Sequence, residues 1–265
     1  MLCYFACEFP QFVAGFLHGS RGTGRSFREE TITDIMMANL KLLGRDRVIV
    51  RFPNEPRTGA DMEWNFVNRS DGSYYRLLIQ AKLASGETPN WARHTYRQLS
   101  HCVRGEYQAD ILCQESRTSI VPTYPLYIFY HPLHICQSAI RARCPNVEGA
   151  NLANGYFVRY HAVREERRLT LFDRQLTSLR DLFCDPTQDD NYLPTPAGVR
   201  DYLLNKNGIQ FSRAALFHAM GIELPPSIGT TIPDDVLRII ENPDEGDPTQ
   251  SDRWTVIFLS DRSTD

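Results

Sequence analysis

The stretch TGADMEW at positions 58–64, followed by LIQAK at positions 78–82, decides the fold of this 265-residue chain. Residues 60–67 alternate between apolar and polar, which is typical of a half-buried strand with Asp61, Glu63 and Asn65 on one face. Residues 74–83 are apolar on both faces until Gln80 and Lys82, which indicates a strand in the centre of a sheet. The two strands therefore carry acids, an amide and an amine toward one place.

A tight turn is predicted between these strands. Residues 70–73 read SDGS, and Asp-Gly is the strongest short hairpin signal because Gly accepts the positive φ of a type I′ turn. A turn centred on residues 71–72 sets Asp61 opposite Lys82 and Glu63 opposite Gln80, with Cβ atoms about 5 Å apart. A shift of one residue would move one strand's side chains to the other face and separate the group.

This combination of side chains suits metal-dependent cleavage of phosphodiesters. Such cleavage needs a cation on the phosphate and a group that activates or orients water. Mg²⁺ requires only one or two carboxylates beside the substrate phosphate, so Asp61 and one further acid suffice. Lys82 would act as a base or as an electrostatic stabiliser, and both roles stay open. The alternative is an ordinary Asp61–Lys82 ion pair on a solvated face, which would stabilise the fold only a little.

An acidic helix is predicted upstream, over residues 26–40. Ser26 is the expected N-cap, with Glu29 three residues later completing a capping box. Glu29 also lies on the apolar stripe that includes Ile32 and Met36, where a carboxylate needs a partner. Glu30 points about 100° away. The sequence leaves open which of the two glutamates supports the site.

The motif order resembles the PD-(D/E)XK, or restriction-endonuclease-like, nuclease superfamily, in the variant with Gln in place of the last acid. The resemblance covers the first half of the chain and implies an αβββαβ core with a central mixed sheet flanked by helices. The motifs EETITD (29–34), GADMEW (59–64), QAK (80–82) and PLYIFY (125–130) also resemble an uncharacterised bacterial family.

The superfamily resemblance further implies roles for individual residues. Asp61 would bind a divalent metal, Mg²⁺ or Mn²⁺, and the Gln80 side chain or the Ala81 carbonyl would complete the site. Lys82 would position or activate water, and the upstream glutamate would support the metal. Gln80 departs from the common pattern, because a neutral amide removes one negative charge that would hold a hard cation. Glu63 or Glu29 is expected to restore that charge.

The expected function is therefore a metal-dependent nuclease, with DNA favoured over RNA, in bacterial defence or as a toxin. The alternative is a catalytically silent nucleic-acid-binding or protein-interaction module on the same fold, since folds can lose catalysis and keep their shape. The net charge of −3 argues against a polycation that coats DNA, so contacts should come from a local basic patch. Candidates for this patch are Arg25, Arg57, Arg97 and Arg104.

The fold class expected from the whole chain is α/β. Residues 1–150 would form the nuclease-like core and residues 151–265 a C-terminal α+β accessory region packed on it, or the two would form one domain. Residues 47–52 predict a strand that pairs with the strand at 60–67. Farther along, the patterns predict a strand at 155–160, helices at 194–205 and 232–241, and a final strand at 254–259.

The remaining sequence features concern the cellular compartment. Seven cysteines are scattered without disulfide-like pairing, as expected for a reducing compartment. Glu8 and Pro10 interrupt the apolar first seventeen residues, which disfavours a signal peptide. No uncharged apolar stretch of 18 residues or more is present. We therefore expect a cytoplasmic protein with no membrane partner, and the sequence does not indicate an oligomeric state.

Overall fold

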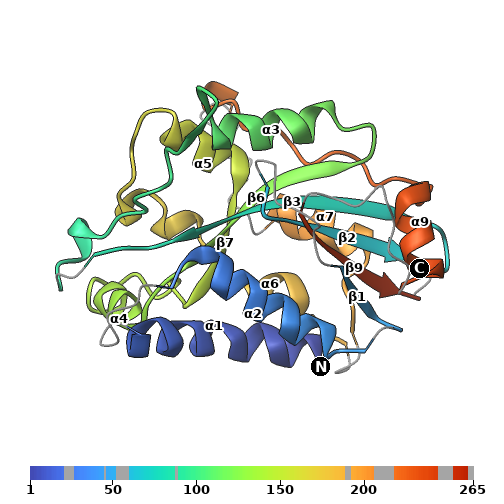
Figure 1. The fold of residues 1–265 in the computed structure, drawn as a ribbon, viewed down its shortest axis with the longest axis horizontal. Helices are drawn as coiled ribbons and strands as arrows, with labels where there is room; N and C mark the ends of the chain where they lie inside the picture. The colour runs from blue at the N-terminus through green and yellow to red at the C-terminus, as the bar shows by residue number, and fades with distance from the viewer. Residues whose placement is uncertain are drawn as a thin grey trace.

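A seven-stranded mixed sheet with helices on both faces forms the centre of the molecule (Figure 1). The structure is a computed structural model, and it describes residues 1–20, 27–44, 46–51, 60–86, 89–188, 192–205, 218–243 and 253–261. The predicted α/β class is confirmed. In sheet order the strands are β1 (Val48–Arg51), β9 (Trp254–Ser260), β2 (Met62–Asn68), β3 (Tyr74–Leu83), β6 (Thr123–Tyr130), β7 (Ala150–Asn154) and β8 (Thr177–Ser178).

The C-terminal strand occupies a central place in this sheet. β9 runs parallel to β2 on one side and antiparallel to β1 on the other. The predicted pairing of the strand at 47–52 with the strand at 60–67 is therefore wrong. Residues 255–260 of β9 are all buried, and a strand that is buried on both faces is most stable between two neighbours. The sheet consequently joins strands from before and after residue 150.

The β2–β3 hairpin forms with a register two residues from the predicted one. β2 and β3 are antiparallel, and Met62 pairs with Ile79. Continuing this register sets Asp61 opposite Gln80, and Glu63 pairs with Leu78. The predicted pairs of Asp61 with Lys82 and of Glu63 with Gln80 are wrong. Because the shift is an even number of residues, each side chain keeps its predicted face.

The turn explains the shift. The backbone N–H of Asn68 donates to the carbonyl of Ser73 at 3.0 Å, so the loop contains residues 69–72 rather than two residues. The Asn68 side chain accepts a hydrogen bond from the N–H of Ser70, and the Asp71 side chain accepts one from the N–H of Ser73. Side-chain turns of this kind compete with the tight hairpin that Asp-Gly favours.

The helices form two layers that cover opposite faces of the sheet (Figure 1). α1 and α2 share a core with Trp64 and Phe66 of β2, and α3 and α5 share a core with Tyr127 and Phe129 of β6. A small hairpin precedes α3 and consists of β4 (Cys102–Val103) and β5 (Glu106–Tyr107). The helices of more than one turn are α1 (Leu2–Gly19), α2 (Glu29–Lys41), α3 (Gln108–Thr118), α4 (Leu133–Arg141), α5 (Gly155–Ala162), α6 (Leu179–Phe183), α7 (Pro196–Asn205) and α9 (Asp234–Glu241).

Of the elements predicted after residue 150, three are confirmed and one is wrong. The helices at 194–205 and 232–241 and the final strand at 254–259 are confirmed as α7, α9 and β9. The predicted strand at 155–160 is wrong, because these residues form α5. The Asn154 side chain caps this helix by accepting hydrogen bonds from the N–H groups of Tyr156 and Phe157. This N-cap overrides the strand propensity of the aromatic and β-branched residues that follow.

One pair of cysteines contradicts the expectation of unpaired thiols. Cys3 of α1 forms a disulfide with Cys184, which follows α6, over a Cα–Cα distance of 4.8 Å. The two positions are 181 residues apart, and only the fold brings them together. None of the helices in the described part of the chain combines the length and the apolar character that crossing a bilayer needs.

Candidate metal-binding and catalytic site

Asp61 is held between three central strands. Its backbone N–H donates to the carbonyl of Ile79 on β3, and its carbonyl accepts from the N–H of Trp254 on β9. Its carboxylate Oδ2 accepts two hydrogen bonds from β3, from Gln80 Nε2 at 2.5 Å and from the backbone N–H of Ala81 at 2.7 Å. The two motif segments of the sequence therefore meet through direct contacts, and the acid is oriented by its partners.

The Gln80 amide is only half satisfied. Its nitrogen donates to Asp61, whereas its oxygen Oε1 is buried without a hydrogen-bond partner among the residues that the structure describes. Buried polar atoms almost always have a partner, and an orphaned acceptor needs a donor or a cation. The hydrogen bonds from Gln80 and Ala81 both end on Oδ2 of the Asp61 carboxylate. Carboxylate and amide oxygens are the ligand types that a hard divalent cation prefers, so the chemistry of Asp61 and Gln80 fits such an ion.

Lys82 lies beside this pair and is almost fully buried. Its Nζ donates to Oε1 of Gln108 at 2.8 Å and lies 4.0 Å from Oε1 of Glu29. Glu29 and Gln108 are the first residues of α2 and α3, so the two helices bring their N-termini to the same point from opposite layers. Lys82 is thereby fixed between an amide and a carboxylate.

The charges of the site oppose the cost of burial. Desolvation raises the pKa of Asp61, and the nearby Lys82 ammonium acts in the opposite direction. Desolvation lowers the pKa of Lys82, and the carboxylates of Asp61 and Glu29 counteract it. Each group therefore depends on the other for its charge, which is typical of reactive sites and also of structural ion pairs.

The structure separates the three glutamates that the sequence left open. Glu29 is the one in contact with Lys82, and 15% of its side chain is exposed. Glu30 is an exposed residue and acts on Lys82 only through its charge. The predicted capping box is wrong, because α2 begins at Glu29 with Arg28 as its N-cap and no side-chain capping bond. Ser26 lies outside the described residues.

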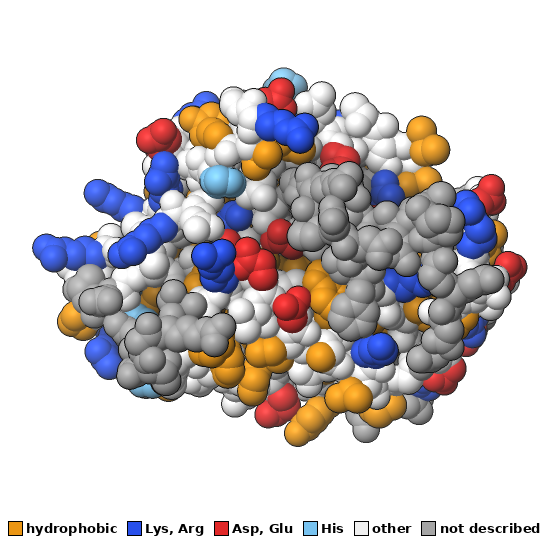
Figure 2. Space-filling view, in the orientation of Figure 1, with side chains coloured by type: hydrophobic (Ala, Val, Ile, Leu, Met, Phe, Trp, Pro, Cys, Tyr) orange, Lys and Arg blue, Asp and Glu red, His pale blue; other side chains and the backbone are white. Residues whose placement is uncertain are grey.

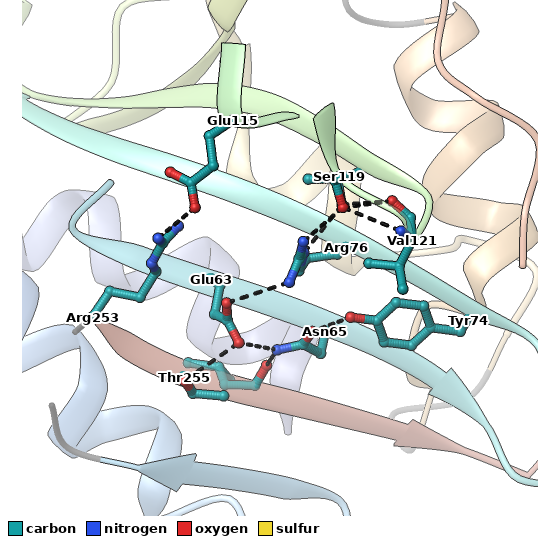
Figure 3. Close-up of polar contacts among 11 residues, drawn as sticks. Glu63, Asn65, Tyr74, Arg76, Glu115, Ser119, Val121, Arg253 and Thr255 are labelled. Atoms are coloured by element: carbon teal, nitrogen blue, oxygen red, sulfur yellow. Dashed lines mark hydrogen bonds and ion pairs between the residues drawn. The ribbon is translucent and has the colours of Figure 1, made fainter. Parts of the chain in front are cut away.

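Glu63 belongs to a different polar network, farther along the sheet (Figure 3). Its Oε1 accepts hydrogen bonds from Asn65 Nδ2 at 3.2 Å and from Thr255 Oγ1 at 3.4 Å, and its Oε2 lies 3.9 Å from Arg76 Nη1. Tyr74 closes the network by donating to Asn65. The described structure therefore brings Asp61 together with residues 80–82 and Glu29, whereas Glu63 makes its contacts with Asn65, Thr255 and Arg76.

Sequence reasoning missed the contacts of two residues beside the site. Gln108 receives the Lys82 hydrogen bond, and its place at the start of the helix after the motif strand was the one available signal. Arg253 directly precedes β9, next to the Asp61 end of β2, and its Nη2 donates to Oε1 of Glu115 on α3 (Figure 3). Nothing in the local sequence links the segment around Arg253 to Asp61, because their proximity depends on β9 lying beside β2.

Acidic side chains gather near the middle of the face that Figure 2 shows, in the region between α2 and α3, and Lys and Arg side chains lie around them. Arg97 and Arg104 are exposed residues, and Arg104 adopts a φ of 53° in the turn of the β4–β5 hairpin. Arg25 and Arg57 lie outside the described residues. Two of the four arginines predicted to contact nucleic acid are therefore exposed in the described part of the chain, and that contact stays a prediction.

Comparison with known proteins places the chain in a family without an assigned activity. The model of a family of unknown function (DUF6615) matches residues 2–265, so the chain belongs to this family over almost its entire length. No curated protein matched the sequence, and no solved structure matched it either.

Proposed function

We propose that this protein is a metal-dependent nuclease of the PD-(D/E)XK type that hydrolyses phosphodiester bonds, with DNA as the favoured substrate. One observation carries the proposal. Asp61, the unpartnered oxygen of Gln80, the buried Lys82 and the Glu29 carboxylate meet between the N-termini of two helices. A purely structural ion pair would not require an orphaned amide oxygen beside a buried carboxylate.

The metal would be Mg²⁺ or Mn²⁺, held by the Asp61 carboxylate with Gln80 Oε1 or the Ala81 carbonyl, and supported by Glu29. When bound, the ion would polarise the phosphate and lower the pKa of a coordinated water. The positive ends of the α2 and α3 dipoles lie at this point and would favour the negative charge of a phosphate. The protein's own contribution is to fix these oxygens in place before substrate arrives.

Lys82 would act at the reacting phosphate. Its ammonium is oriented by Gln108 and lies close to Glu29, so its position is fixed before substrate binds. In its charged form it would stabilise negative charge that develops on the phosphate oxygens. Burial lowers the pKa of Lys82, so a larger fraction of its side chain is the neutral amine at a given pH. The neutral amine can accept a proton from water.

A second candidate function rests on the same contacts. Gln80 donates to Asp61, and Lys82 donates to Gln108. Asp61, Gln80 and Lys82 therefore all have hydrogen-bond partners within the protein without any added ion. A protein that keeps these contacts permanently would bind nucleic acid or a protein without cutting it.

The test is incubation of the purified protein with plasmid, linear duplex and single-stranded DNA, and with RNA, in Mg²⁺, Mn²⁺ or EDTA. Asp61→Asn, Lys82→Met and Glu29→Gln should each lose cleavage, whereas Glu166→Gln, on an exposed residue far along the chain, should retain it. Cleavage that is equal in all variants, or that persists in EDTA, would refute the proposal. Binding of nucleic acid without cleavage would support the silent module.

A further inference from the structure

Three cysteines outside the nuclease-like site converge where α1 meets the end of α6. Cys3 and Cys7 are four residues apart in α1, so they lie on one face of the helix, one turn apart. Cys184 is the C-cap of α6, which packs against α1 (Figure 1). The three Sγ atoms all lie within 4.8 Å of one another.

We propose that these three cysteines form a redox-gated binding site for a thiophilic divalent cation of the Zn²⁺ class. In the oxidised protein, Cys3 and Cys184 form the disulfide and Cys7 is a free thiol. In the reduced protein, all three become thiolate ligands. Zn²⁺ binds thiolates at about 2.3 Å, which sets sulfur atoms about 3.8 Å apart in a tetrahedron. The observed cluster is close to this size and needs only small side-chain adjustments.

The chemistry balances with one external component, a dithiol reductant. A dithiol reductant first reduces the disulfide to two thiols and is itself oxidised to a disulfide. Binding of the cation then releases one proton from each of the three thiols to solvent. The resulting site carries three protein ligands, and water can complete the tetrahedron.

The cluster lies at the N-terminal end of α1 and borders two hollows. Cys3 lies in the first turn of an eighteen-residue helix, where the dipole stabilises negative charge. Arg180 lines the two hollows that adjoin the cluster, one bordered by Cys3 and Cys184 and the other by Cys7. The hollows also give the sulfur atoms access to solvent, so an ion or a reductant can reach them.

The other cysteines lack these conditions. Burial raises the pKa of Cys113 and of Cys136 to about 12. Cys144 donates to the Asp173 carboxylate, and burial together with that carboxylate raises its pKa to about 11. Cys102 is exposed in the short β4–β5 hairpin. Only the cluster at α1 and α6 combines several sulfur atoms within the described residues.

Through this site, the redox state of the cysteines and the binding of a cation would both affect how firmly α1 is attached to the rest of the fold. This helix contributes buried residues to the large core that also contains Trp64 and Phe66. Either the disulfide or the bound cation would fasten α1 to α6, whereas the reduced and metal-free protein would have neither link. Reduced protein should therefore be stabilised by Zn²⁺, and oxidised protein should not.

The experiment titrates Co²⁺, and then Zn²⁺ as a competitor, into full-length protein that is reduced or oxidised. The variants are Cys7→Ser, which leaves both disulfide partners in place, and the matched control Cys102→Ser. Free thiols are counted by reaction with a chromogenic disulfide before each titration. Reduced wild type should bind about one equivalent of Co²⁺ with a thiolate charge-transfer band, as expected for a single tetrahedral site.

Cys7→Ser should bind at least tenfold more weakly, and Cys102→Ser should match wild type. Zn²⁺ should raise the melting temperature of reduced wild type but not of oxidised protein or of Cys7→Ser. Three results would each overturn the proposal. These are reduced wild type without a charge-transfer band, equal binding by Cys7→Ser and wild type, and a disulfide that no reductant opens in the folded protein.

Discussion

Restoring the acid at position 80 gives a sharp test of the site's geometry. In Gln80→Glu, a carboxylate replaces the amide whose nitrogen donates to Asp61 Oδ2 at 2.5 Å. The hydrogen bond is lost, and two carboxylates face each other in a buried place. At a separation of about 4 Å and an effective dielectric constant of about 20, their repulsion is about 4 kcal/mol. Lys82 offsets part of it, so we expect a loss of about 2–4 kcal/mol in unfolding free energy in EDTA.

Proton uptake sets an upper limit on this loss. A glutamate with an ordinary pKa of about 4.3 can be protonated at pH 7 for about 4 kcal/mol, and the pair would then share one proton. The carboxyl introduced at position 80 has a folded-state pKa above its unfolded value. The destabilisation is therefore present at pH 7 and shrinks by about 1.4 kcal/mol per unit as the pH falls toward 4.3. Mg²⁺ or Mn²⁺ should also remove it, because a cation replaces the proton.

The assay is urea unfolding at pH 7 and pH 5, in EDTA and in excess Mg²⁺ or Mn²⁺. Gln108→Glu is the matched control, because the same substitution there meets the Lys82 ammonium at the end of a 2.8 Å hydrogen bond. A charged acceptor strengthens that bond by about 1 kcal/mol, so this variant should not be destabilised. Equal losses in the two variants, or no loss in Gln80→Glu, would refute the arrangement described around Asp61.

Three further predictions concern stability. Burial lowers the pKa of His131 to about 4, so the folded state resists its protonation, and stability should fall by about 2 kcal/mol between pH 7 and pH 5; His131→Asn should flatten this fall in urea unfolding, and an unchanged slope would contradict it. Glu63→Gln should cost about 1–2 kcal/mol by leaving Arg76 less well paired, yet calorimetry should find unchanged Mn²⁺ affinity; weaker binding would return Glu63 to the metal site. A Cβ at Gly149 would lie 1.7 Å from a backbone carbonyl oxygen of α1, whereas a Cβ at Gly15 would meet open space. Gly149→Ala should lower the free energy of unfolding by about 3 kcal/mol, and Gly15→Ala should raise it by up to about 1 kcal/mol. Similar melting temperatures of the two variants would show that α1 is docked differently.

The sequence predicted the sheet face of each site residue correctly, but it did not predict the strand register. The face follows from the alternation of apolar and polar residues in the two motif strands, which reflects burial. Register depends on the turn, where the side chains of Asn68 and Asp71 bind nearby backbone groups and lengthen the loop. Competition between turn types is a matter of a few hydrogen bonds. The even shift kept Asp61, Gln80 and Lys82 on one face despite the wrong register.

Long-range neighbours were beyond the reach of local patterns. The insertion of β9 between β1 and β2 brings the start of β9, with Arg253 just before it, beside the Asp61 end of β2, although the two positions are far apart in the sequence. The sequence left the choice between Glu29 and Glu30 open, and the structure sets Glu29 against Lys82 at the N-terminus of α2. This choice depends on how α2 packs against β3, and helix periodicity alone does not give that packing.

The neutral residue at position 80 also explains how this arrangement can fold without a metal. With an acid there, Asp61 would have a like charge as its nearest polar neighbour, and the buried pair would need a cation or a proton to remain folded. With Gln80, the amide nitrogen neutralises that conflict by donating to Asp61, and the cost moves to one unpartnered oxygen. An unsatisfied acceptor costs about 1–3 kcal/mol, which is no more than the about 4 kcal/mol of repulsion between two carboxylates. If Asp61 binds a divalent cation as proposed, the neutral residue at position 80 would weaken that binding and stabilise the metal-free protein. The metal affinity of Gln80→Glu should then exceed that of the wild type.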